Sequence, residues 1–198
     1  MTIEHTFNVN ANYHQQATVS NTDTCVFSLP QEYGFVLIGA ACVAFLIILQ
    51  GFVVIGSRRS KFFSKDFMKQ FEAEHKRHFT SDITKSDGYP DMGNGLYGQK
   101  LPYDQWREFN QAQRVHYNFL EHIASVLVFI LITGISYPWP AVGLSAATVI
   151  GRICYGFYIG DKGANNPLRI TGALLGDIVL LAGFIMSVMS GLKMSCTI

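Results

Sequence analysis

An apolar run near the N-terminus constrains the fold more than any other feature of the sequence. Residues 34–56 read GFVLIGAACVAFLIILQGFVVIG and contain one strongly polar side chain, Gln50. A helix of this length spans about 34 Å, enough to cross the ~30 Å hydrocarbon core of a bilayer. Because lipid offers the backbone no hydrogen-bond partners, such a segment must be helical. The sequence therefore predicts an integral membrane protein.

Three further apolar segments follow, at about residues 119–135, 141–158 and 170–191. The first two are separated by SYPWP, whose prolines cannot continue a helix and whose aromatic rings suit the membrane interface. We therefore predict an all-α protein, an integral-membrane four-helix bundle with four transmembrane helices.

The polar segments divide the chain. We expect an N-terminal extension at 1–31, a four-span membrane domain at 32–191 with a long polar loop at 57–113, and a C-terminal tail at 192–198. Within the loop, SKDFMKQFEAEHKRHF predicts a surface helix. The stretch SDGYPDMGNGLYGQKLP is rich in turn residues and predicts an ordered or semi-ordered connection.

The distribution of basic residues predicts an orientation. Residues 1–33 contain no lysine or arginine, the 57–113 loop contains ten, and the last connection carries Lys162 and Arg169. The positive-inside rule places both basic loops on the cytoplasmic-type face and both termini opposite, with Lys193 as the exception. The first 25 residues lack the features of a secretory signal or a mitochondrial presequence. A net charge of +1 gives no reason to expect a nucleic-acid partner.

The cysteines and histidines do not form a metal-binding pattern. Cys25, Cys42, Cys154 and Cys196 contain no CxxC pair, and we expect free thiols. Cys42 and Cys154 lie in apolar segments, where burial as small hydrophobic residues is expected. His116 and His122 lack a third ligand at a suitable spacing, so no metal site is predicted.

Three polar residues at the start of the second span fall on one helical stripe. Arg114, Asn118 and Glu121 stand at positions i, i+4 and i+7, which share one face of a helix. Other span ends on the same predicted side of the membrane carry further arginines and tyrosines: Arg58, Arg59, Arg152, Tyr155, Tyr158 and Arg169. The sequence therefore predicts a polar site at one membrane face.

This set of residues suits glutathione, which has two carboxylates, an ammonium and a thiol. Guanidinium groups bind carboxylates in a bidentate way, and Glu121 could meet the ammonium. A thiol pKa near ~8.5 falls beside a guanidinium. Structural roles remain open. The arginines could extend toward the interface and set topology, Glu121 could pair with Arg114, and Asp177 is expected to pair with a basic or hydroxyl group between helices.

Four segments together carry a family resemblance. EYGFVLIGAACVAF, FNQAQRVHYNFLEH, IGRICYGFYIG and RITGALLG occur in this order between residues 32 and 191. They resemble the MAPEG family, the membrane-associated proteins in eicosanoid and glutathione metabolism, in its microsomal glutathione S-transferase 3 branch. The resemblance implies a left-handed four-helix bundle in a homotrimer, in the endoplasmic reticulum or alternatively a mitochondrial membrane. Glutathione would lie between neighbouring subunits at the cytoplasmic-type face.

The resemblance also assigns roles to residues. It implies that Arg169 stabilises the glutathione thiolate and is the catalytic residue. His116 and His122 stand where relatives often have glutamine and tyrosine, and Arg58 or Arg59 would reach in from the neighbouring subunit. The implied glutathione-binding residues are Arg58, Arg59, Arg114, His116, Asn118, Glu121, His122, Tyr155 and Tyr158.

The implied function is that of a membrane-bound glutathione transferase or glutathione-dependent peroxidase. Glutathione would be the co-substrate, and a lipophilic electrophile or lipid hydroperoxide would arrive from the bilayer. The 57–113 loop and the N-terminal extension are longer than in relatives. The alternative is therefore a non-catalytic structural subunit of a larger membrane complex, such as a respiratory assembly, built on the same fold.

Overall fold

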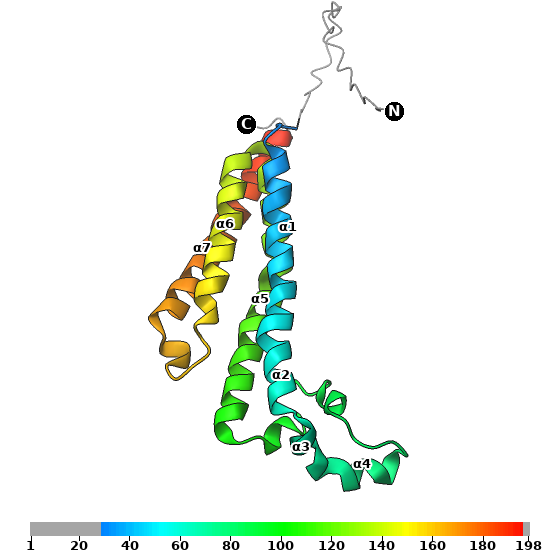
Figure 1. Ribbon diagram of the computed structural model, residues 1–198. Coiled ribbons are helices and arrows are strands. Elements are labelled where there is room, and N and C mark those ends of the chain that lie inside the picture. Colours follow the sequence, from blue (N-terminus) through cyan, green and yellow to red (C-terminus); the bar gives the residue numbers. More distant parts are fainter. Residues whose placement is uncertain (1–28, 196–198) are drawn as a thin grey trace, which may run out of the picture.

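The computed structural model describes residues 29–195, and its long helices lie side by side in one bundle (Figure 1). α1 packs against α5 and α6, and α7 packs against the same two helices. The regular structure of the described residues is entirely helical, so the predicted all-α bundle is confirmed. The four long helices are α1 (Tyr33–Gln50), α5 (Tyr103–Ser136), α6 (Pro138–Gly156) and α7 (Pro167–Met194).

Three helical stretches of the described chain are long and apolar enough to cross a membrane. They are Tyr33–Phe62, Tyr103–Ser136 and Pro167–Met194. The 19-residue α6, predicted as the third span, does not reach the same standard, because Arg152 and two prolines interrupt its apolar composition. It nevertheless packs among the other three helices. The bundle therefore contains three to four membrane helices by composition, where four were predicted.

The first span does not end where the sequence predicted. α1 continues as a π-helix, η1 (Gly51–Gly56), and then as α2 (Ser57–Phe62). π-Helical turns are rare and occur frequently at functional sites. At the other end of the bundle, the predicted SYPWP turn separates α5 from α6. Pro138 occupies the first turn of α6, where its missing N–H removes no helical hydrogen bond.

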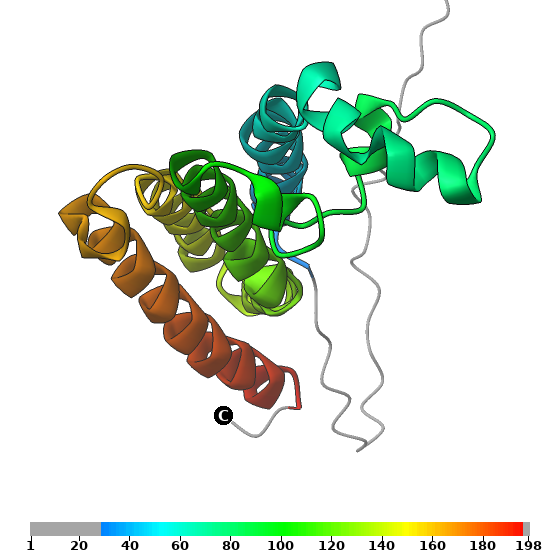
Figure 2. The same ribbon diagram turned by 90° about the horizontal axis from the view of Figure 1, so that it is seen from below.

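Residues 63–102, here called the polar extension, form a folded unit that projects to one side of the bundle (Figure 2). Residues 65–78, where one surface helix was predicted, are helical, but they are divided into three short helices and bury Met68. Ile55, Phe62 and Phe109 come from the flanking helices and complete the core of the extension, with Phe63, Met68, Ile83 and Leu101. Its elements are α3 (Lys65–Met68), η2 (Lys69–Phe71), α4 (Glu72–His78), η3 (Lys85–Gly88) and η4 (Gly98–Lys100).

Two aspartates order the glycine-rich part of the polar extension. The buried Asp91 carboxylate accepts hydrogen bonds from the backbone N–H groups of Gly93, Gly95 and Gly98, at 2.8, 3.1 and 2.7 Å. At the start of η3, the backbone N–H of Thr84 donates to Asp87 at 2.7 Å, and this bond lowers the pKa of the Asp87 carboxyl. The predicted ordered connection is therefore present.

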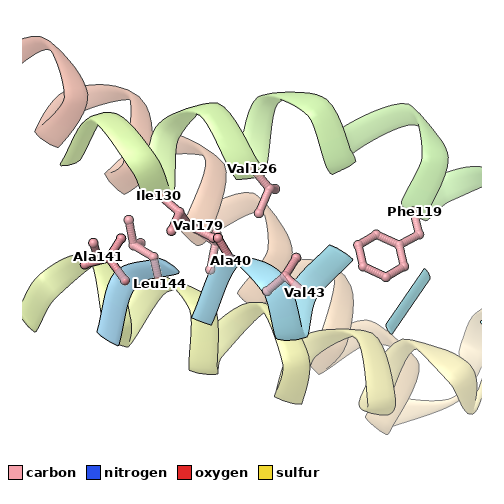
Figure 3. Packing of buried hydrophobic residues seen from close by; sticks show 9 residues of the cluster. Ala40, Val43, Phe119, Val126, Ile130, Ala141, Leu144 and Val179 are labelled. Carbon is pink, nitrogen blue, oxygen red and sulfur yellow. The ribbon is translucent and has the colours of Figure 1, made fainter. Parts of the chain in front are cut away.

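Small and aliphatic residues form the core of the bundle (Figure 3). The cluster comprises Val36, Ala40, Val43, Phe119, Val126, Ile130, Ala141, Leu144 and Val179. Hydroxyl groups join α5 to α7 beside it. Ser190 donates to the Ile132 carbonyl oxygen at 2.9 Å, and the hydroxyls of Thr133 and Ser187 lie 3.3 Å apart. Small residues and hydroxyl bonds of this kind are typical of helix contacts in membranes.

The predicted burial of two cysteines is only partly correct. Cys42 is free and exposed, because α1 turns Val36, Ala40 and Val43 toward the core and Cys42 to the opposite side. Cys154 is free and half-buried. Cys25, Cys196 and most of the predicted N-terminal extension lie outside the described residues.

Candidate functional site

A close approach of α6 and α7 brings the site's tyrosines and Arg169 together. A Cβ atom on Gly172 would lie 2.5 Å from the Tyr155 backbone nitrogen and 2.6 Å from the Gly151 carbonyl oxygen. Only glycine permits the two backbones to come this near. Since Arg169 lies one turn before Gly172 on α7, its side chain meets α6 directly.

Arg169 lies against two stacked tyrosine rings. The rings of Tyr155 and Tyr158 have centroids 6.2 Å apart, and the Arg169 guanidinium carbon lies 5.1 and 5.6 Å from them. An Arg169 Nη lies 3.5 Å from the Tyr155 hydroxyl oxygen, a long hydrogen bond. Its Nε is buried without a hydrogen-bond partner among the described residues. The guanidinium is thus positioned by aromatic rings and neutralised by no acid in this part of the chain.

Arg152 links α6 to α5 and binds the side chains of two residues that were predicted to bind glutathione. One Nη donates to the Asn118 side-chain oxygen at 2.7 Å, and the other lies 3.3 Å from His122 Nδ1. The guanidinium also stacks over the Phe119 ring at 4.5 Å. Arg152 is buried. Sequence reasoning placed it near the site but did not predict that it would bind Asn118 and His122 directly.

Arg114 and Glu121 form the intrahelical pair that was one structural alternative. Their closest nitrogen and oxygen atoms are 3.4 Å apart, and about half of each side chain is exposed. A pair this open to solvent contributes about 0–1 kcal/mol. Both groups therefore keep most of their capacity to bind a charged ligand.

Most of these groups line a cavity of about 200 Å³, here called the arginine cavity, but Glu121 and Tyr158 do not. Three arginines and one carboxylate line it, so its charge suits an anionic ligand. Its volume is below the ~300–1,000 Å³ of most small-molecule sites. The lining residues are Arg114, Asn118, His122, Arg152, Tyr155, Arg169, Gly172, Ala173, Gly176 and Asp177.

Asp177 does not form the pair that the sequence predicted. It lies at the arginine cavity with an exposed side chain. Its side chain makes no hydrogen bond or ion pair within residues 29–195. Arg152, a cation of the same cavity, is bound to Asn118 and His122.

The arginines of the first span lie elsewhere in the chain. Arg58 pairs with Glu108 at 2.9 Å and donates to the Val54 carbonyl oxygen at 2.9 Å. Arg59 donates to the Asp91 carbonyl oxygen at 3.1 Å and stacks over the Tyr89 ring at 4.8 Å. Neither residue lines the arginine cavity of its own chain.

A second cavity, of about 520 Å³, lies between η1, α5 and the polar extension. Arg59 and His116 line it, together with Gln113, a residue that sequence reasoning missed. Gln113 is almost fully buried, and neither amide atom has a partner in the described part of the chain. Buried amides are normally hydrogen-bonded, so Gln113 places an unpaired polar group in a cavity lined mostly by apolar side chains. We call it the π-helix cavity.

The MAPEG family model matches residues 35–189. The chain belongs to the MAPEG family. A search of the solved structures found no match. The MAPEG match includes all four long helices, both cavities and the polar extension. Together with the apolar helices, it establishes an integral membrane protein of this family.

Proposed function

We propose that the protein is a membrane glutathione transferase or glutathione-dependent peroxidase of the microsomal glutathione S-transferase 3 type. One observation carries the proposal. The Arg169 guanidinium, which pairs with no acid among the described residues, faces the Tyr155 hydroxyl in a cavity that contains two further arginines. A cation in this position stabilises a thiolate, and its arginine neighbours suit the two carboxylates of glutathione.

Each side chain then has a defined task. Arg169 holds the thiolate by charge, and the Tyr155 hydroxyl donates a hydrogen bond to it. Arg114 binds a carboxylate and Glu121 binds the ammonium, which their loose mutual pairing permits. Asn118 and His122 act through Arg152, which they hold in place.

The thiolate supports two reactions with balanced electrons. In transfer, its sulfur bonds to the carbon of a lipophilic electrophile, which releases its leaving group. In hydroperoxide reduction, the sulfur attacks the terminal oxygen, the O–O bond breaks, and the released alkoxide takes a proton. A second glutathione then converts the sulfenic acid to a disulfide and water.

The proposed enzyme is a homotrimer in a lipid bilayer, with glutathione between neighbouring subunits. Two features support this arrangement. The arginine cavity is small for glutathione by itself, and the π-helix cavity places Arg59 and His116 on a different face of the chain. A second copy would supply Arg59 to the first, as the family resemblance implies.

The test is glutathione thiolate formation by detergent-purified protein, followed by ultraviolet absorbance. We expect a thiolate signal from the wild type and its loss in Arg169→Leu, because the thiol pKa returns toward ~8.5. Arg77→Leu removes the same charge from the exposed α4 helix and should keep the signal. A folded wild type without any thiolate signal would contradict the enzyme, and equal loss in both variants would contradict the role of Arg169.

A further inference from the structure

A third cavity, of about 470 Å³, lies between the first turns of α5 and the connection from α6 to α7. It shares only Arg114 with the arginine cavity. It is lined by Trp106, Arg107, Asn110, Gln111, Arg114, Tyr158, Lys162, Gly163, Ala164 and Asn165. We call it the interface cavity.

The charge of the interface cavity has one sign. Arg107, Arg114 and Lys162 line it, and no carboxylate does. The Lys162 side chain is exposed and makes no hydrogen bond or ion pair within the described residues. Arg107 donates to the Asp161 carbonyl oxygen at 2.8 Å, a bond that leaves its charge in place. Like charges gathered this way repel one another unless an anion joins them.

The walls of the cavity are fixed by hydrogen bonds. The Gln111 side chain accepts from the Gly160 backbone N–H and donates to the Gly160 carbonyl oxygen, both at 3.0 Å. Asn110 donates to the Gly93 carbonyl oxygen at 2.9 Å. Two loops far apart in sequence are thus attached to one turn of α5. A site formed in advance loses less entropy when its ligand binds.

The cavity lies at the boundary between membrane and water. The candidate span of α7 begins at Pro167, five residues after Lys162. The 34 residues of α5 extend about 51 Å, more than the ~40–45 Å of a whole bilayer, so one end stands outside the hydrocarbon. Trp106 and Tyr158 are residue types that gather at this depth. Basic pockets between membrane helices at such positions bind acidic headgroups.

We propose that the interface cavity binds a phosphate group, carried by an anionic phospholipid or free in solution. Arg107 presents the planar fork that suits two phosphate oxygens, and Lys162 adds a point charge on a flexible stem. Arg114 lies between this phosphate and the arginine cavity. The interface cavity is therefore distinct from the arginine cavity and adjoins it through Arg114.

The test uses delipidated full-length protein in neutral detergent. Dioleoyl phosphatidic acid and dioleoyl phosphatidylcholine, whose headgroup has no net charge, would be titrated separately, with bound lipid counted by native mass spectrometry. Inorganic phosphate would be titrated against chloride at equal ionic strength, with thermal unfolding as the readout. Lys162→Glu is the test variant, since its side chain makes no hydrogen bond or ion pair in the described structure. Lys100→Glu makes the same charge change on exposed η4.

We expect the wild type to prefer phosphatidic acid, and Lys162→Glu to weaken that binding about tenfold or more. Lys100→Glu should change it less than twofold, and both variants should keep the glutathione thiolate signal. Stabilisation by inorganic phosphate that Lys162→Glu removes would identify free phosphate as a ligand, and its absence would identify the lipid. Equal binding of both lipids without any phosphate effect, or equal weakening in both variants, would overturn the proposal.

Discussion

The bundle and the polar extension have cores of different kinds. Small and branched aliphatic residues dominate the bundle core, which includes Val36, Ala40 and Ala141. The extension core is aromatic, with Phe63 stacked edge-on against Phe109 at 5.4 Å and flanked by Phe67 at 5.8 Å. One chain therefore builds two buried clusters with different side chains.

The surrounding solvent explains the difference. In water, burial of apolar surface contributes about 25 cal/mol per Å². Inside a bilayer the lipid is as apolar as the core, so this drive is absent and close packing and hydrogen bonds hold the helices together. The bundle accordingly leaves large side chains such as Phe52 and Leu181 mostly exposed. Truncation of a core side chain should therefore destabilise the polar extension most. Addition of a side-chain atom at a close helix contact should destabilise the bundle most.

The largest expected effect is loss of the extension core in Phe63→Ala. Phe63 is fully buried, and such truncations cost about 3–5 kcal/mol. Amide hydrogen exchange across residues 63–101 of the full chain should accelerate about 100-fold or more. Phe79→Ala removes an equal ring that is mostly exposed and should change exchange little. Similar rates in the two variants would show that the extension does not depend on an aromatic core.

A smaller loss is expected from Asp91→Ala. The change leaves three backbone N–H groups without their acceptor, at a cost of about 3 kcal/mol, because bonds to charged groups are strong. Proteolysis of the full chain should then begin within residues 91–98. Asp82→Ala removes an exposed carboxylate paired with Lys76 and serves as control. Unchanged protease resistance in Asp91→Ala would show that the Asp91 carboxylate does not hold this loop in place.

Crowding of the bundle is tested by Gly172→Ala. The added methyl group meets backbone atoms of α6, so the helices must separate, at about 1–3 kcal/mol. The thermal unfolding temperature in detergent should fall. The thiolate signal should also fall, because Arg169 moves away from Tyr155. Gly176→Ala, one turn further on, has open space for its methyl group and should keep the unfolding temperature of the wild type. Equal stability of the two variants would refute the close approach of α6 and α7.

The smallest effect is expected from Ser190→Ala. Side-chain hydrogen bonds between membrane helices average about 0.6 kcal/mol, so loss of the bond to Ile132 should lower stability by about that amount. Thr171→Ala, whose hydroxyl bonds within its own helix, is the control for helix propensity. A loss of several kcal/mol, measured by reversible unfolding in detergent, would mean that hydroxyl bonds rather than packing dominate the bundle.

The sequence was sufficient for the features that helical periodicity determines. It predicted the apolar helices, the turn at SYPWP, and the stripe of Arg114 and Asn118 at the end of the bundle. These follow from composition and from residue spacing within one helix. Four sequence segments, one at each span, carry the family resemblance, and membership of the MAPEG family is confirmed.

Contacts between helices could not be predicted in the same way. Spacing along α5 does not determine that Arg152 reaches Asn118, or that the Asp177 side chain has no ion-pair partner within residues 29–195, because these depend on how neighbouring helices rotate about their axes. The prediction that Cys42 is buried was wrong for the same reason. The π-helix also shifts the register after Gly51, so Arg58 turns to Glu108 at the start of α5.

α5 has a mechanical consequence that neither of its ends reveals separately. It runs unbroken through 34 residues, with Phe109 in the extension core and Asn118 beneath Arg152 about 13.5 Å further along the axis. One end of the helix lies in water and the other in lipid, and the helix connects them rigidly. When the polar extension tilts, Asn118 and the wall of the arginine cavity tilt with it, so the two regions cannot move independently.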